Sequence, residues 1–162
     1  MMLKGTKIIS LTVALTISNM WAQCPAPEKM VKAATKSKET WGVNSQSKAG
    51  ALITGQSYEM SFIAQGDYDY RITSGTANPD KGEVSFEVYE MVTEKDDKGQ
   101  YKKVKKVLIS SQDAESNTVE FTTDKGRKLM IAVTFEGSDS DNKKPECVAV
   151  LIEDKKTTKI GY

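Results

Sequence analysis

Polar and apolar side chains alternate at every second position through several stretches of this chain. Residues 57–64 (SYEMSFIA), 68–72 (YDYRI) and 84–92 (VSFEVYEMV) all follow this period of two. Such alternation is typical of a β-strand with one face buried and one face in water. The pattern therefore predicts a protein made mostly of half-buried strands, beginning near residues 49–54.

Two pairs of these stretches predict β-hairpins with three-residue loops, because that loop length places apolar residues opposite one another. The first has the loop Gln65–Asp67, and it pairs Ala64 with Tyr68, Phe62 with Tyr70, and Met60 with Ile72. The second has the loop Asp124–Gly126, with the glycine in the third position, where a left-handed backbone is preferred. It pairs Phe121 with Leu129 and Val119 with Ile131.

A lysine-rich stretch follows the strand at 84–92 and the turn EKDDKGQ. Its lysines at 102, 103, 105 and 106 indicate a solvated strand face or edge protection, and nearby acidic residues would neutralise them. Residues 107–109 (VLI) are apolar at consecutive positions, which indicates either burial on both sides or a bulge. The last stretch, 146–154 (ECVAVLIED), has a continuous apolar run that is typical of a strand deep in a sandwich.

These stretches amount to about eight strands with short, regular spacing. One short helix is predicted before them, in the segment that follows Pro25 and Pro27 and ends near Lys38. The expected fold is all-β: an antiparallel two-sheet β-sandwich, jelly-roll-like, with one short N-terminal helix.

The first residues predict a signal peptide covering residues 1–22, because Lys4 and Lys7 precede an apolar run at 8–17. That run is too short to span a membrane, and no later run is long enough. Residues 23–162 then form a single domain, and the expected location is the periplasm or outside the cell. A lipid anchor through Cys24 is the alternative to cleavage before Gln23.

Composition excludes several classes of function. The chain has no histidine, which removes Ser-His-Asp and Cys-His catalysis. Its formal net charge is +1, so charge gives no reason to expect nucleic acid as a partner. Its two cysteines, Cys24 and Cys147, predict one disulfide in an exported chain.

Candidate sites are few, and the sequence predicts no enzyme because nothing pairs the outward glutamates across a cleft. Aromatic and amide side chains are candidates for ligand binding: Trp41, Asn44, Gln46, Tyr89 and Tyr101. The two tyrosines are expected to flank one another at the end of their hairpin. For Trp41, a position that plugs one end of the core is the preferred interpretation, because a tryptophan buries so much area, and ligand binding is the alternative. Asp139, Asp141 and Asn142 are clustered oxygen ligands that would suit calcium, but the lack of EF-hand spacing favours a solvated loop, and no other cofactor is expected.

The segment from Trp41 to Ile72, with its W-x-x-NSQS run and its DYR strand, resembles a block in small exported proteins of Bacteroidota-type bacteria. That family has no assigned activity, so the resemblance implies export and a β-sandwich alone. The layout is also similar to prepeptidase C-terminal-type jelly-roll modules. The functional hypothesis is an exported, non-catalytic module that binds a protein or glycan partner of the cell envelope. A structural envelope component and a small hydrolase are the alternatives.

Overall fold

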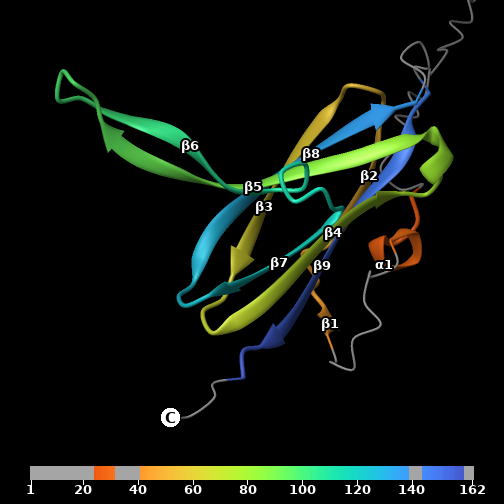
Figure 1. The fold of residues 1–162 in the computed structure, drawn as a ribbon, viewed down its shortest axis with the longest axis horizontal. Helices are drawn as coiled ribbons and strands as arrows, with labels where there is room; N and C mark the ends of the chain where they lie inside the picture. Colours follow the sequence, from red (N-terminus) through yellow and green to blue (C-terminus); the bar gives the residue numbers. More distant parts are fainter. Residues whose placement is uncertain (1–23, 32–40, 139–143, 159–162) are drawn as a thin grey trace, which may run out of the picture.

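The computed structural model describes residues 24–31, 41–138 and 144–158, which form two antiparallel β-sheets and one short helix (Figure 1). The described elements, in chain order, are α1 (Pro27–Met30), β1 (Gly42–Val43), β2 (Lys48–Leu52), β3 (Ser57–Ala64), β4 (Tyr68–Thr76), β5 (Gly82–Lys95), β6 (Tyr101–Ser110), β7 (Thr118–Thr123), β8 (Arg127–Gly137) and β9 (Glu146–Lys156). The predicted all-β sandwich with a short N-terminal helix is confirmed.

The strands divide between two sheets. Sheet A has the order β1-β9-β4-β7, with β2 also paired to β9, and sheet B has the order β3-β8-β5-β6. The uninterrupted apolar run of β9 is explained by its position, because it pairs with β1 and β2 on one side and with β4 on the other. The strand predicted to lie deep in the sandwich is therefore central in sheet A.

The pairing follows the plan of a jelly roll, in which one long double ribbon is wound around a core. The paired strands are β2 with β9, β3 with β8, β4 with β7, and β5 with β6. Contacts of β4 with β9 and of β5 with β8 then join successive turns of the ribbon. Each corner of the roll moves two connections together from one sheet to the other.

Both predicted hairpins are wrong for this reason. β3 pairs with β8, whereas β4 pairs with β7 and β9, so the Gln65–Asp67 connection crosses between the sheets. Phe62 and Tyr70 do meet, edge to face with ring centroids 5.0 Å apart, but they meet across the core. The alternation of apolar residues shows which face of a strand is buried, and it does not show which strand lies alongside.

The second predicted hairpin fails at the same corner, since β7 belongs to sheet A and β8 to sheet B. The two connections lie against each other, and the Asp67 amide donates a hydrogen bond to the Thr123 carbonyl at 2.7 Å. A Cβ on Gly66 would lie 2.9 Å from the Asp124 carbonyl oxygen. Glycine is needed there because the two chains cross too closely for a side chain.

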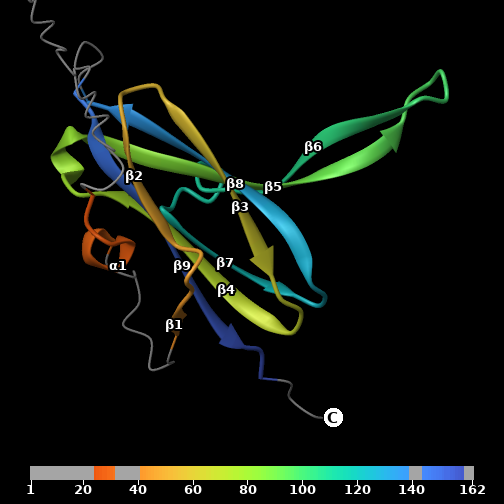
Figure 2. The same ribbon diagram turned by 180° about the vertical axis from the view of Figure 1, so that it is seen from behind.

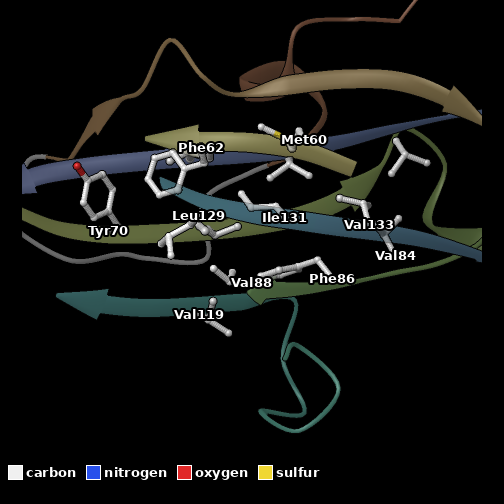
Figure 3. Close-up of a cluster of buried hydrophobic side chains, with 14 of the residues drawn as sticks. Met60, Phe62, Tyr70, Val84, Phe86, Val88, Val119, Leu129, Ile131 and Val133 are labelled. Atoms are coloured by element: carbon white, nitrogen blue, oxygen red, sulfur yellow. The ribbon is translucent and has the colours of Figure 1, made fainter. Parts of the chain in front are cut away.

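The core fills the space between the sheets (Figure 3). Its largest fully buried side chains include Tyr70, Phe62, Phe86 and Leu129. Tyr70 places its hydroxyl at the corner, where it accepts a hydrogen bond from the Gln65 amide at 2.7 Å. Burial raises the pKa of Tyr70, which keeps the hydroxyl protonated.

The N-terminal segment lies on the outer face of sheet A. Cys24 and Cys147 form the predicted disulfide, with their Cα atoms 5.5 Å apart. Val31 packs against Ala149 and Leu151 of β9. The helix is shorter than predicted within the described residues, and residues 32–40, along with the signal peptide predicted at 1–22, lie outside them.

The hairpin of β5 and β6 extends beyond the sandwich as a two-stranded arm, seen from both sides in Figures 1 and 2. We define the arm as residues 90–106, because Tyr89 is the last residue of β5 that pairs with β8. The register of β5 with β6 shifts between Val88 and Tyr89, which leaves Leu108 as an extra residue. The bulge alternative for residues 107–109 is therefore correct, and a bulge bends a ribbon at the point where this one leaves the body.

Candidate functional site

A polar depression of about 630 Å³ lies on the outer face of sheet B, and we call it the trough. β3, β8, β5 and β6 each contribute outward-facing side chains to it, because alternate residues of a strand project to the same face. Its lining includes Ser57, Glu59, Ser85, Glu87, Lys105, Gln112, Ala132, Thr134 and Glu136.

The sheet register fixes the arrangement of two carboxylates in the trough. Glu59 of β3 pairs with Ala132 of β8, and Ala132 pairs in turn with Glu87 of β5. The two glutamates therefore flank a small alanine, with backbones about 10 Å apart across two strand spacings. A residue as small as alanine at this point leaves the floor of the trough open.

Tyr89 holds one of these carboxylates in place. Its side chain is buried, and its hydroxyl donates a hydrogen bond to Glu59 at 2.7 Å. Burial, followed by the hydrogen bond to the Glu59 carboxylate, raises the pKa of Tyr89 to about 12. The tyrosine therefore stays a hydrogen-bond donor at all physiological pH values.

Lys105 organises the other carboxylate. Its ammonium lies 2.7 Å from the Glu87 carboxylate and 4.4 Å from the centre of the Tyr89 ring. Three carboxylates, those of Glu59, Glu87 and Glu136, share the trough with this one ammonium group. The lining thus carries a formal charge of about −2, which disfavours anionic ligands.

The five predicted ligand-binding residues do not form one site. Trp41 lies at the outer face of sheet A, where the Arg71 guanidinium is 4.1 Å from the centre of its ring. Arg71 is 2% exposed and is paired with Glu120 and Glu153 of the neighbouring strands. Trp41 is half-buried and lies outside the cluster of core residues, so it covers a buried cation instead of plugging the core.

Asn44 and Gln46 are engaged in the hydrogen bonds of one loop. The Asn44 amide donates to Asp154, and its oxygen accepts from the backbone and side chain of Gln46. The Gln46 amide pairs with both backbone groups of Ile63, at 3.0 and 2.8 Å. These two side chains tie the loop before β2 to the free edge of β3.

The predicted neighbourhood of Tyr89 and Tyr101 is wrong. Tyr89 pairs with Val107 at the base of the arm, whereas Tyr101 pairs with Lys95 near its tip. The two tyrosines are separated because β5 continues six residues past Tyr89, to Lys95, before the turn.

The predicted calcium ligands Asp139, Asp141 and Asn142 lie outside the described residues. Within 24–31, 41–138 and 144–158, no group of three His, Cys, Asp or Glu residues could hold a metal ion. Over the same ranges, no helix is long and apolar enough to cross a membrane.

Sequence reasoning missed most of the trough. The outward orientation of Glu59 and Glu87 follows from the alternation of their strands, but the register that places both beside Ala132 cannot be read from that pattern. One signal did exist, since serine, threonine and glutamate alternate with core residues in three consecutive strands of sheet B.

Comparison of the chain with protein-family models, with curated proteins and with solved structures found no match. The resemblance to small exported proteins therefore stays a prediction, and any functional conclusion depends on the geometry of the chain itself.

Proposed function

We propose that this protein is an exported, non-catalytic β-sandwich module that binds a neutral glycan in the trough of sheet B. The observation that carries the proposal is the trough itself: an open depression of about 630 Å³ lined by hydroxyl and carboxylate groups from four strands and by the Gln112 amide, which follows β6. Sugar hydroxyls both donate and accept hydrogen bonds, and this lining offers partners of both kinds.

The charge of the trough favours neutral sugars over acidic ones. Glu59 and Glu136 offer acceptor oxygens, whereas Lys105 is the one cationic side chain in the lining. A uronate or sulfated sugar would bring like charge close to the carboxylates. The lining has no exposed aromatic ring as a stacking platform, since Phe86 is buried and Tyr58 is half-buried against the core. We therefore expect weak binding to a single site.

The disulfide supports export, because such bonds persist in oxidising compartments. It also bears on the lipid-anchor alternative, since the Cys24 sulfur that is bonded to Cys147 is not free to carry a lipid. A periplasmic or extracellular location follows as part of the proposal.

A small glycoside hydrolase is the second candidate, favoured by the pair of glutamates that flank Ala132. Hydrolysis requires one carboxylate as acid and another as base or nucleophile, on either side of a bound glycosidic bond. In this trough Glu59 is hydrogen-bonded to Tyr89, and Glu87 is ion-paired to Lys105. The trough is also wide and open, so it excludes little water. These features favour binding over catalysis.

The test uses the mature chain and a panel of immobilised neutral, amino and acidic oligosaccharides. Ala132→Met fills the floor of the trough without removing a polar group, and it should weaken binding about tenfold or more, or about 1.4 kcal/mol. Lys128→Met is the matched control, because Lys128 lies on the same face of β8 outside the lining.

The proposal fails if Ala132→Met and Lys128→Met bind every oligosaccharide as the wild type does. Release of reducing sugar that disappears in Glu59→Gln or Glu87→Gln would establish the hydrolase instead. Binding confined to acidic oligosaccharides would show that the trough is not the site.

A further inference from the structure

The two faces of the β5–β6 arm carry different chemistry. In the arm, the even-numbered residues of β5 lie on the same side of the strand as its core-facing residues. The charged residues among them have partners of opposite charge on β6. Glu90 pairs with Lys106 and Glu94 with Lys102, on either side of Val92 and Val104. On this matched face, opposite charges therefore lie directly across from one another on the two strands.

The opposite face of the arm has lysines without matching carboxylates. Met91 pairs with Lys105, Thr93 with Lys103, and Lys95 with Tyr101. Among the paired positions 90–95 and 101–106, no acidic residue occupies this lysine face. Lys105 reaches back to Glu87 in the trough, at 2.7 Å, so Lys103 and Lys95 are left without an acidic partner on the face.

β6 is also the edge strand of sheet B, so one side of its backbone is unpaired. The Asp96 amide donates to the Gln100 carbonyl at the turn. Hydrogen-bonded pairs alternate along an antiparallel ladder, so the backbone groups of Lys102, Val104 and Lys106 point toward β5. Those of Tyr101, Lys103 and Lys105 point away from β5, toward solvent.

The free edge and the lysine face therefore involve the same residues. A strand added to β6 would place its side chains directly opposite those of Lys103 and Lys105, on one face. Exposed apolar groups lie beside them, since Met91 is 51% and Tyr101 is 75% exposed.

We propose that β6 of the arm is the docking edge for an extended acidic segment of a partner protein, which adds as a strand and places alternate carboxylates against Lys103 and Lys105. Strand addition supplies affinity through main-chain hydrogen bonds and specificity through alternate side chains. Charge complementarity selects this occupant, because a second copy of β6 in antiparallel register would set lysine against lysine. The same lysines thus exclude self-association and admit an acidic strand.

The test uses the full mature chain and three labelled ten-residue peptides in which Thr alternates with Glu, Gln or Lys. The Glu–Thr peptide should bind, and the other two should bind at least tenfold more weakly. K103Q/K105Q should weaken Glu–Thr binding about tenfold. K102Q/K106Q makes the same charge change on the matched face and should weaken binding less than threefold. Amide hydrogen exchange at Tyr101, Lys103 and Lys105 should slow when the peptide is bound.

Four results would overturn the proposal. Equal losses in the two double variants would indicate non-specific attraction to any lysine. Unchanged exchange at the outward amides would rule out strand addition, even if the peptide bound. Binding of the Glu–Thr peptide no tighter than of the Gln–Thr peptide would remove the charge argument. Self-association of the wild-type chain through β6, measured by sedimentation and lost in Lys103→Pro, would identify a second copy as the occupant.

Discussion

The trough and the arm share two strands, β5 and β6, yet they differ in how the fold supports their side chains. The first half of β5 pairs with β8, its residues 87–89 pair with β6 as well, and it lies over a core that includes Phe86 and Val88. The second half pairs with β6 alone and has no layer beneath it. β5 thus passes from a supported sheet to an unsupported ribbon at the position where β6 has its bulge.

The difference shows what a core contributes to a binding surface. In the trough, buried Tyr89 fixes Glu59, and Lys105 fixes Glu87, so the polar groups are already positioned for a ligand. In the arm, side chains are exposed and only cross-strand pairs organise them. A positioned polar face suits a small rigid ligand, whereas an open edge suits a chain that supplies its own backbone hydrogen bonds.

The largest expected effect compares two substitutions on β5. Phe86→Ala removes a side chain that is 2% exposed beneath the trough, and it should cost about 3–5 kcal/mol in the free energy of unfolding. Val92→Ala, in the arm, should cost less than about 0.5 kcal/mol, as partly exposed sites typically do. Urea denaturation followed by circular dichroism measures both. Equal costs would mean that the arm is as well packed as the body.

The second-largest effect on stability is expected from the disulfide, and it should be confined to the sandwich without the arm. It closes a sequence separation of 123 residues, and its loss should cost about 2–4 kcal/mol, which corresponds to a melting temperature lower by about 10 °C. Because Cys147 belongs to sheet A, the Cys24→Ala/Cys147→Ala variant should keep both binding surfaces of sheet B. Calorimetry measures the stability, and the peptide and glycan assays serve as controls. Loss of either binding activity in the folded variant would contradict the separation of the two sheets.

The sequence predicted the strands of the sandwich far better than the connections between those strands. The period-two pattern identified which apolar side chains of β3, β4, β7 and β8 face the core, because that depends on the strand face alone. It did not predict that Arg71 and Thr73, on the opposite face of β4, are buried as well. It could not distinguish a hairpin from a crossing between sheets, since Phe62 and Tyr70 share one apolar surface in either arrangement. The turn signal at Gly126 was equally compatible with a corner of the roll.

The sites were less predictable, for a related reason. Cys24 and Cys147 had no alternative partners, so their bond followed from composition. The trough depends on Glu59, Ala132 and Glu87 meeting through two registers, and neither register is encoded within a single strand. The sequence offered Trp41 as a ligand-binding or core residue, whereas its contact with Arg71 depends on the fold.

A smaller effect is expected from the hydroxyl that orders the trough. Tyr89→Phe should lower the free energy of unfolding by about 1 kcal/mol at neutral pH, because it removes the hydrogen bond to Glu59. The pKa of Tyr89 is raised in the folded chain, from 10.0 to about 12, so the folded state favours the protonated hydroxyl. That stabilisation is complete below pH 10 and is lost as the pH rises toward 12.

The difference in stability between the wild type and Tyr89→Phe should therefore shrink across this range, which chemical denaturation at several pH values measures. The comparison of two proteins removes the contribution of lysines that titrate at the same pH. A constant difference would mean that Tyr89 does not titrate with folding.

The smallest expected effect tests why the two faces of the arm differ. Glu94→Gln removes the carboxylate that pairs with Lys102 on the matched face, and this exposed site should change stability by less than about 0.5 kcal/mol. If the carboxylates of the matched face prevent Lys102 from binding the peptide, Glu94→Gln should bind the Glu–Thr peptide about twofold to threefold more tightly at low salt. Lys102→Gln, nearly silent in the wild type, should then cancel this gain. Glu94 is preferable to Glu90, because Glu90 also lies 3.9 Å from Arg127 of the body. Peptide titration of the four proteins measures the coupling between the two positions. A coupling of zero between positions 94 and 102 would mean that the orientation of the β6 backbone alone determines which face of the arm binds the peptide. The carboxylates of the matched face would then take no part in it.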